Sequence, residues 1–549
     1  MNKKLTPFVI VILLVSLFLS VLQLSVVGAT ENSWITKEPM HTARGGLGVA
    51  VVNGKIYAIG GSNNAAQLGI TEEYNPITDT WTAKSPMPTP RSGFAIVVYQ
   101  NRIYCIGGTT GDSDNFVSGF TGVTEVYDPA ADKWETKAPM ITPRADLCAG
   151  VVNGSIYCIG GKEYWGVDPF YSELNVTEAY DPTSNTWTAK SPMPIPVFGG
   201  ASAVVDGKIY VIGGSRHFQL GWELSTVGSN QVYDPNNDTW STRASLPHAE
   251  SYGAAVATSG ITASKRIYFV GGSNETNYSP VPYAYNPELN VWSHGASIPI
   301  PRVYLALAVL DDVLYAIGGF DGESWLNVNE EYIPLDYGTV PPDIQILSPE
   351  NRTYTSKDIG LILSVNRPTT WIGYSLDKQA NVTVTGDTEL PEMSEGEHSL
   401  TVYVNDTFGN LVSSSMVSFS VDTFAPHIVV LSPENKTYGG SDVQSAFTVD
   451  EPVSWMGYSL DGQDNVTITG NVTLAVLSSG SHSITFYAID LVENSGASGT
   501  VYFEIAPFPT VLVVAVAVTI TITAAAVYLF LKRRKTITTM KLKQDILPP

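Results

Sequence analysis

The chain has 549 residues, enough for about three or four folded units. Its 48 glycines, 34 prolines and 10% aromatic residues favour strands and turns, and 44% hydrophobic residues argue against an intrinsically disordered chain. A formal net charge of −22 argues against nucleic-acid binding, which needs a basic surface, and three cysteines are too few for a disulfide scaffold.

The N-terminus has the pattern of a signal peptide, predicted over residues 1–29. Lys3 and Lys4 precede an uncharged apolar stretch over residues 8–27, and the small residues Gly28 and Ala29 follow. A short cationic region, an apolar core and small residues are the features that signal peptidase recognises. We predict cleavage after Ala29, with an uncleaved membrane anchor as the alternative.

Residues 34–337 contain an internal repeat with a period near 50. Five of the six repeated tyrosines are followed seven residues later by a tryptophan, and each unit contains a Gly-Gly doublet. Residues 48–61 have the pattern of two apolar strands joined by an Asn-Gly turn, and two further strands follow. Four strands in each of six units predict a six-bladed β-propeller over residues 30–338. The doublets begin at 60, 107, 160, 213, 271 and 318, the tyrosines stand at 74, 127, 180, 233, 285 and 332, and the tryptophans at 34, 81, 134, 187, 240 and 292.

The spacing also predicts how the ring closes. No tryptophan stands seven residues after Tyr332, whereas Trp34 precedes the first doublet. The N-terminal strand around Trp34 should therefore complete the sixth blade and remove the open sheet edges. The Gly-Gly, Tyr and Trp pattern closely resembles kelch repeats over about 300 residues.

Four arginines occupy one position of the repeat, just before the first strand of a blade. The resemblance to kelch proteins implies that such arginines line the central pocket, where they would suit a carboxylate ligand. The alternative is that they maintain the repeat by bonding loop carbonyls. The four are Arg44, Arg91, Arg144 and Arg302, with Val197 and Glu250 at the equivalent position of blades four and five.

The loops between the second and third strands are longer in blades two, three and four, and they contain many aromatic residues. Exposed aromatic side chains stack on sugars or anchor protein partners, although a longer loop can also use them for a small core of its own. The candidate ligand-binding aromatics are Trp165, Tyr171, Phe218 and Trp222, beside Phe116, Phe120, Tyr164, Phe170 and His217.

No catalytic set stands out, and the sequence predicts neither a cofactor nor a metal. The seven histidines are scattered, and no tyrosine is followed directly by the histidine that galactose oxidase-like enzymes would require. Cys105 and Cys158 stand where other repeats place apolar core residues, so we expect buried thiols.

Two halves of a second repeat follow, aligned without a gap at a spacing of 84 residues. Alternating runs predict strands, and each half contains one tryptophan and no cysteine. These halves resemble the immunoglobulin-like domains of prokaryotic surface proteins, over residues 343–422 and 427–505. His398 and His482 occupy equivalent positions, which favours a shared packing role over a metal site.

Residues 510–531 form an uncharged apolar segment, long enough at about 1.5 Å per residue to cross a bilayer. Four basic residues follow at 532–535, so the tail over residues 532–549 is expected to be cytoplasmic and the preceding part extracellular. The signal peptide carries +2 and the tail +5, which leaves −29 for the external part. Eleven possible glycosylation sites precede the apolar segment: Asn153, Asn175, Asn237, Asn274, Asn277, Asn351, Asn381, Asn405, Asn435, Asn465 and Asn471.

The sequence thus predicts an all-β, single-pass membrane protein of the cell surface, with a six-bladed kelch propeller, two immunoglobulin-like sandwiches and one transmembrane helix. We expect binding or adhesion at the propeller face, with a glycan or a surface protein as ligand and no nucleic-acid partner. The alternatives are a carbohydrate-active enzyme of the kelch mutarotase type and a structural envelope component. The missing Leu-Pro-x-Thr-Gly motif and the many sequons favour an archaeal host.

Overall fold

The computed structural model describes residues 30–111, 119–164, 171–217, 224–275, 277–507 and 510–541. The predicted signal peptide lies outside these residues. The chain divides into two compact units. The first ends at Pro342 and also takes in Asn366–Pro368 and Asn405–Leu411, and the second holds the other residues from Asp343 onward.

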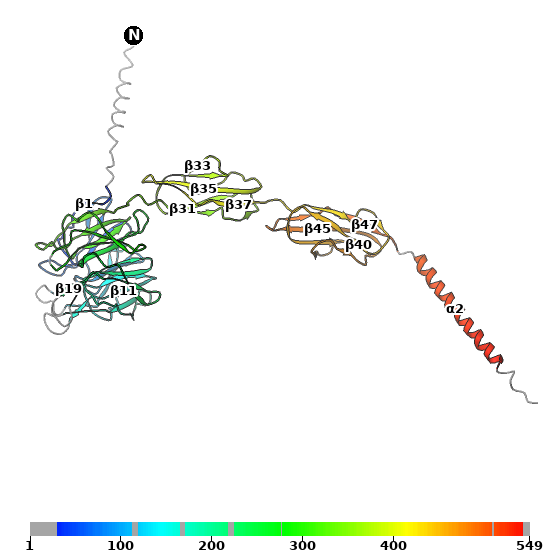
Figure 1. The fold of residues 1–549 in the computed structure, drawn as a ribbon, viewed down its shortest axis with the longest axis horizontal. Helices are drawn as coiled ribbons and strands as arrows, with labels where there is room; N and C mark the ends of the chain where they lie inside the picture. The colour runs from blue at the N-terminus through cyan, green and yellow to red at the C-terminus, as the bar shows by residue number, and fades with distance from the viewer. Residues whose placement is uncertain are drawn as a thin grey trace, which may run out of the picture. The chain divides into compact units, whose positions relative to one another are not determined.

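The first unit contains six four-stranded antiparallel sheets among its described residues, one for each predicted blade (Figure 1). In five of them the strands follow chain order, from the innermost to the outermost. Blades one to three are β2 (Gly48–Val52), β3 (Lys55–Ile59), β4 (Thr71–Asn75), β5 (Thr80–Lys84); β6 (Ala95–Tyr99), β7 (Arg102–Ile106), β8 (Thr124–Asp128), β9 (Lys133–Lys137); and β10 (Cys148–Val152), β11 (Ser155–Ile159), β14 (Thr177–Asp181), β15 (Thr186–Lys190). Blades four and five are β16 (Ala201–Val205), β17 (Lys208–Ile212), β20 (Asn230–Asp234), β21 (Thr239–Arg243); and β22 (Ser251–Ala257), β23 (Ile267–Ser273), β24 (Tyr283–Asn286), β25 (Val291–His294).

The sixth blade closes the ring as predicted. Its strands β26 (Ala306–Leu310), β27 (Val313–Ile317) and β28 (Asn329–Ile333) are completed by β1 (Ser33–Lys37), which pairs antiparallel with β28. Trp34 lies opposite Tyr332 in this ladder, with the ring centroids 4.8 Å apart. The first strand in the chain therefore forms the outer edge of the last blade.

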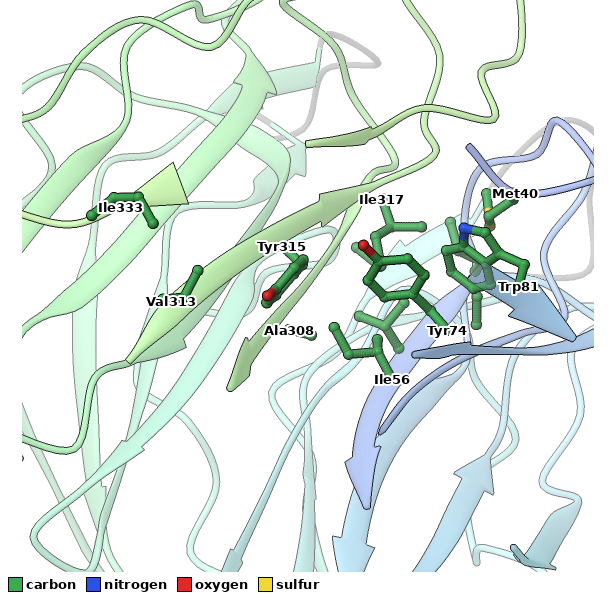
Figure 2. Close-up of a cluster of buried hydrophobic side chains, with 13 residues drawn as sticks. Met40, Ile56, Tyr74, Trp81, Ala308, Val313, Tyr315, Ile317 and Ile333 are labelled. Atoms are coloured by element: carbon green, nitrogen blue, oxygen red, sulfur yellow. The ribbon is translucent and has the colours of Figure 1, made fainter. Parts of the chain in front are cut away.

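The core of the propeller lies between neighbouring blades. Figure 2 shows one such cluster, in which Tyr74 and Trp81 of blade one and Tyr315 and Ile317 of blade six belong to the same buried group. Within a blade, the repeated tyrosine packs on the repeated tryptophan at about 5 Å between centroids, as in the Tyr74–Trp81 pair. Such packing of aromatic rings adds to the stability of the fold beyond the burial of apolar area alone.

The repeated tryptophans also tie each blade to the one before it. The indole N–H of Trp81 donates to the carbonyl of Glu38 at 2.7 Å, and Trp134 donates to Ser85 at 2.8 Å. Trp187, Trp240, Trp292 and Trp34 make the same bond to Ala138, Ser191, Ala244 and Ala296. A buried indole needs a partner for its one donor, which explains why the tryptophan recurs in every unit.

Two extra hairpins extend the long loops of blades three and four. They pair β12 (Lys162–Tyr164) with β13 (Tyr171–Glu173) and β18 (Ser215–His217) with β19 (Leu224–Thr226).

The residues after the propeller form two β-sandwiches with equivalent strands, each around its own core. In both, a six-stranded sheet packs against shorter strands. The first comprises β29 (Ile344–Ser348), β30 (Thr353–Tyr354), β31 (Gly360–Val365), β32 (Thr369–Leu376), β33 (Val382–Val384), β34 (Thr388–Glu389), β35 (Gly396–Asp406), β36 (Leu411–Ser413) and β37 (Val417–Val421). The second comprises β38 (Ile428–Ser432), β39 (Thr437–Tyr438), β40 (Val443–Gln444), β41 (Ala446–Val449), β42 (Val453–Leu460), β43 (Val466–Ile468), β44 (Thr473–Leu474), β45 (Gly480–Asp490), β46 (Ser495–Ala497) and β47 (Val501–Ile505).

The one helix of the described residues is α2 (Thr510–Lys541). Its stretch Val514–Lys535 is long and apolar enough to cross a membrane, by length and composition. The hydroxyls of Thr519, Thr521 and Thr523 donate to carbonyls four residues earlier, at 2.5 Å each. These bonds satisfy the polar groups within the helix, as a lipid environment requires.

Candidate functional site

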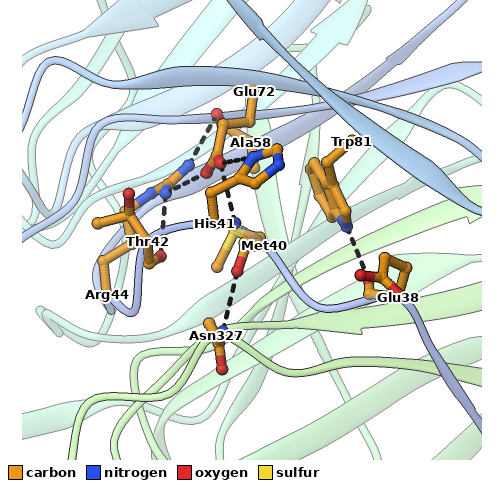
Figure 3. Close-up of polar contacts among 9 residues, drawn as sticks. All are labelled: Glu38, Met40, His41, Thr42, Arg44, Ala58, Glu72, Trp81 and Asn327. Carbon is orange, nitrogen blue, oxygen red and sulfur yellow. Dashed lines mark hydrogen bonds and ion pairs between the residues drawn. The ribbon is translucent and has the colours of Figure 1, made fainter.

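The four repeated arginines lie inside the blades. Their side chains are fully buried, and each guanidinium forms an ion pair with a glutamate of its own blade. Figure 3 shows the first case: Arg44 contacts Glu72 at 2.5 Å and donates to the carbonyls of Thr42 and Ala58, both at 3.1 Å. The other pairs are Arg91–Glu125, Arg144–Glu178 at 2.7 Å and Arg302–Glu330 at 2.6 Å.

This geometry favours the interpretation that the arginines maintain the repeat, and it gives a ligand no free guanidinium at these four positions. A buried charge is tolerated only when it is paired and hydrogen-bonded, and both conditions are met inside the blade. The other two blades change both partners together: blade four has Val197 with Gln231, and blade five has Glu250 with Tyr283.

Around the propeller axis the backbone forms a closed ring of six hydrogen bonds, one residue from each blade. Each N–H donates to the carbonyl of the ring residue in the neighbouring blade, at 2.7 to 2.9 Å. All six residues have a positive φ between 50° and 61°. We call this set the axial ring: Gly46, Gly93, Asp146, Gly199, Tyr252 and Tyr304.

Half of the axial ring is not glycine. The left-handed conformation is easy for glycine and disfavoured for a bulky residue, so Tyr252 and Tyr304 hold a strained backbone at a position where glycine would serve. The neighbouring glycines leave room for these side chains: a Cβ on Gly199 would lie 2.8 Å from Cε1 of Tyr252, and one on Gly93 would lie 2.5 Å from Oδ1 of Asp146. Backbone strain retained in this way is a mark of functional sites.

The two ring tyrosines belong to a group of aromatic side chains on the face formed by the loops before the first strands and those between the second and third strands. The Tyr252 and Tyr304 rings lie 4.6 Å apart, and both are half-buried. Trp325 lies 6.3 Å from Tyr304 and 5.0 Å from Phe320 between centroids. On the other side of Tyr252, the ring of buried Phe198 lies 6.2 Å away.

A cleft of about 320 Å³ opens between blades four, five and six at this place. Tyr252, Tyr304, Tyr278 and Phe320 contribute aromatic surface to it. Its polar lining comes from the side chains of Ser215, Thr226, Ser251, Ser273, Asn274 and Glu275. We call this the aromatic cleft. Its size is at the lower end of the range of about 300–1,000 Å³ that is usual for small-molecule sites.

One ion pair lies beside the aromatic cleft. The ammonium of Lys162 contacts Asp146 of the axial ring at 2.7 Å, and it lies 5.2 Å from the ring centroid of Phe198 and 5.9 Å from that of Tyr252. The carboxylate thus holds the cation against the aromatic faces, where their quadrupoles attract it.

The aromatic loop residues predicted from the sequence are largely not described. Trp165, Phe218 and Trp222 lie outside the described residues, and Tyr171 is described only as the first residue of β13. The two hairpins are linked by His217, whose Nδ1 lies 2.8 Å from Oε2 of Glu173.

Sequence reasoning missed the axial ring, although the chain contains a signal for it. The ring residue stands two places after the repeated arginine, so the series Gly, Gly, Asp, Gly, Tyr, Tyr can be aligned without a structure. Such an alignment does not give the sign of φ. The positive φ is what makes a tyrosine at this loop position strained.

The cysteines are buried as predicted. Burial raises the pKa of each of Cys105, Cys148 and Cys158 to about 12, so the thiols stay protonated. Cys148 and Cys158 belong to different clusters between blades.

The equivalent histidines of the sandwiches make the same contacts. Nδ1 of His398 lies 2.8 Å from Asp377 and its Nε2 lies 2.9 Å from the carbonyl of Ser394; His482 repeats this with Asp461 and Ser478. The Ser478 carbonyl and Asp461 hold the pKa of His482 above its ordinary value, because both nitrogens face acceptors. The predicted shared packing role is confirmed.

Three carboxylates come together in the second sandwich, where oxygens of Asp422, Glu451 and Asp490 lie within 4.8 Å of one another. Such a group has the donor chemistry for a hard cation. In the first sandwich the equivalent of Glu451 is Arg367, which forms an ion pair with Asp406 at 3.1 Å. The same position therefore holds a positive charge in one sandwich and a negative charge in the other.

Comparison with known proteins places the propeller in a family. Residues 56–328 match a family model described as the Attractin/LZTR1 beta-propeller. The Kelch-like protein terF of Aspergillus terreus is 30% identical over 37% of this chain and 46% of its own length. Kelch-like protein 15 of Homo sapiens is 27% identical over 35% of this chain and 33% of its own, and beta-scruin of Limulus polyphemus is 30% identical over 39% and 23%.

The chain thus spans less than half the length of these curated relatives. A solved structure titled "Structure of YjhT" covers 53% of this chain and 95% of its own, with 17% identity and a TM-score of 0.43. The matched residues carry the repeated doublets, tyrosines and tryptophans on six four-stranded sheets. Residues 56–328 of this chain therefore match a β-propeller family model, and they are similar in sequence to kelch-repeat proteins.

Proposed function

We propose that this protein is a cell-surface binding protein whose kelch propeller recognises a glycan or a surface protein at the aromatic cleft. The kelch family supports a binding propeller. The cleft adds a place for the ligand, because it combines aromatic faces with neutral hydrogen-bonding groups on a concave surface.

The observation that carries the proposal is the pair of tyrosines in the axial ring. Three blades use glycine at this position, and the ring hydrogen bonds form there without any side chain. The ring hydrogen bonds therefore do not require a tyrosine in the left-handed conformation. The side chains of Tyr252 and Tyr304 are best explained by what they contact outside the fold.

The proposal extends to the rest of the chain. Helix α2 supports a single-pass anchor, with the basic residues 532–535 favouring a cytoplasmic tail and an extracellular propeller. The two sandwiches, which we propose to be immunoglobulin-like domains over residues 343–422 and 427–505, would then connect the propeller to the membrane.

The test replaces both tyrosines with glycine, the residue that Gly46, Gly93 and Gly199 already supply in other blades. The detergent-solubilised full chain, wild type and Y252G/Y304G, is applied to a glycan array and to immobilised envelope proteins. We expect the double variant to keep its melting temperature, since left-handed strain is relieved, and to lose binding at least tenfold. The control is Ile77→Ser, whose side chain is 91% exposed on the turn between β4 and β5.

Equal binding by a folded Y252G/Y304G variant and the wild type would disprove a ligand site at the aromatic cleft. Loss of binding in the Ile77→Ser control as well would show that the array reports non-specific adhesion.

A further inference from the structure

We propose that the aromatic cleft takes an uncharged sugar residue of a glycan, and that it discriminates against anionic sugars and against a protein surface. This inference rests on the proposed function and specifies its ligand class. It is drawn from four properties of the cleft: the ring faces, the neutral polar lining, the charge and the size.

The first property is the shape of the aromatic surface. Tyr252 and Tyr304 lie side by side at 4.6 Å with 49° between their planes, so they present two inclined ring faces at the rim of the axis. A pyranose ring has one face covered by C–H groups, and such a face packs on an aromatic ring. The polar edge of the same sugar stays available for hydrogen bonds. A tyrosine-rich site can therefore contact the apolar face of the sugar while its polar groups bind the edge.

The second property is the polar lining of the cleft. Ser215, Thr226, Ser251 and Ser273 bring hydroxyls, and Asn274 brings an amide whose Oδ1 already accepts the N–H of Asn277 at 2.9 Å. A hydroxyl both donates and accepts, so this set matches the mixed donors and acceptors of sugar hydroxyls. An apolar side chain of a protein would offer these hydroxyls no hydrogen bond.

The third property is charge. Glu275 is the only charged side chain lining the cleft among the described residues, and the surrounding external part carries −29. The nearest described cation at the ring, Lys162, is already held by Asp146 at 2.7 Å. The four arginines are paired inside the blades. A carboxylate on a sugar would therefore approach a negative lining without a counter-ion, whereas a neutral sugar meets no such penalty.

The fourth property is size together with rigidity. A volume of about 320 Å³ is near the lower end of the range of about 300–1,000 Å³ that is usual for small-molecule sites, so it suits a single small ligand. The axial ring fixes the backbone of both tyrosines by hydrogen bonds of 2.7 to 2.9 Å, so little freedom is lost when a small ligand binds.

The experiment compares neutral and anionic sugars on the detergent-solubilised full chain. The neutral probes are the methyl glycosides of glucose, galactose and mannose and N-acetylglucosamine; the anionic probes are glucuronic acid and N-acetylneuraminic acid. Saturation-transfer NMR identifies the contacting protons, and calorimetric titration gives the affinities. We expect at least one neutral sugar to bind through its C–H face, at least tenfold more tightly than any anionic probe, and to lose at least tenfold in Y252G/Y304G.

A charge variant tests the discrimination between neutral and anionic sugars. Glu275→Lys should reduce or reverse the preference for neutral over anionic sugars, and Glu275→Gln should leave the affinity for the neutral sugar within about threefold. Two results would overturn the inference and leave the proposed function standing, provided that the double tyrosine variant loses the binding in question. One is tighter binding of an anionic sugar than of a neutral sugar by the wild type. The other is binding of an envelope protein but of no sugar. Binding that ignores the tyrosine replacement altogether would overturn both.

Discussion

The N–H of Tyr252 donates to the carbonyl of Gly199 at 2.7 Å, and the phenol ring of Tyr252 lies over the same glycine, where a Cβ would come within 2.8 Å of its Cε1. One residue of blade four thus accepts the backbone bond of blade five and makes space for its side chain. This double role makes Gly199 a sensitive glycine of the axial ring.

Gly199→Ala should therefore destabilise the propeller for two reasons. Alanine at a φ of +60° costs about 1–2 kcal/mol, and displacement of the Tyr252 ring adds to this. The matched control is Gly54→Ala, which has a φ of +72° and nothing within 4 Å of the added Cβ. Thermal unfolding should show a larger loss for Gly199→Ala than for Gly54→Ala; equal losses would mean that the tyrosine ring moves freely.

The buried ion pairs can be tested by copying the pairing of blade four into blade two. Arg91→Val alone leaves Glu125 buried without a counter-ion and should cost about 3–5 kcal/mol of unfolding free energy. Adding Glu125→Gln should recover a large part of that loss, since Val197 and Gln231 coexist in blade four, where the Gln231 amide bonds the backbone of Ile195 at 2.8 and 3.0 Å.

The measurement is a double-mutant cycle on the unfolding of the full chain. The ligand-binding interpretation of the arginines makes the opposite prediction: affinity at the aromatic cleft would fall in the double variant even after stability is recovered. Additive losses without recovery would show that the blades do not tolerate exchange of the pair.

Glu250 should make the stability of blade five depend on pH. Its side chain is buried, its Oε2 has no hydrogen-bond partner within the described ranges, and desolvation raises its pKa to about 7. The unfolded chain ionises near 4.5, so it loses its proton first as pH rises, and the folded state loses stability between about pH 4.5 and 7.

At about 1.4 kcal/mol per pH unit, this loss is on the order of 3–4 kcal/mol. Glu250→Gln should remove the dependence, so the stability difference between variant and wild type should increase from pH 5 to pH 8. Amide hydrogen exchange in β22 and β23 at the two pH values measures it locally. Parallel pH profiles for the two proteins would contradict the assigned pKa.

The second sandwich should be stabilised by Glu451→Arg. The carboxylates of Asp422, Asp450 and Asp490 lie close enough to raise the pKa of Glu451, after the effect of its own desolvation. An arginine would meet Asp490 as Arg367 meets Asp406 in the first sandwich. We expect a gain of about 1 kcal/mol at low salt that shrinks in high salt, measured by the melting of the second sandwich. A loss of stability at low salt would show that the three carboxylates are not in mutual repulsion.

Much of this fold was predictable because its constraints are local and repeated. The seven-residue step from tyrosine to tryptophan is set by one hairpin, as the Tyr74–Trp81 pairing shows. The absence of a tryptophan seven residues after Tyr332 was enough to place Trp34 beside Tyr332. The 84-residue spacing likewise predicted equivalent contacts for His398 and His482.

The site was less predictable, because its chemistry depends on where a side chain points. Arg91 could be assigned either to the axis or to the blade interior until Glu125 was found beside it on β8 of the same blade. The joint change of both positions in blades four and five was visible in the sequence and would have favoured the interior. Tyr252 gave no such pattern, since its meaning depends on a positive φ.

The placement of β1 outside β28 has a mechanical consequence. The chain leaves the propeller from β28, and this strand is paired on both sides, with β1 and with β27. Tension arriving along the chain from Asp343 onward therefore pulls on an interior strand and must break two ladders of hydrogen bonds, whereas an edge strand would peel from one. A propeller closed in this way resists being unravelled from its C-terminal end.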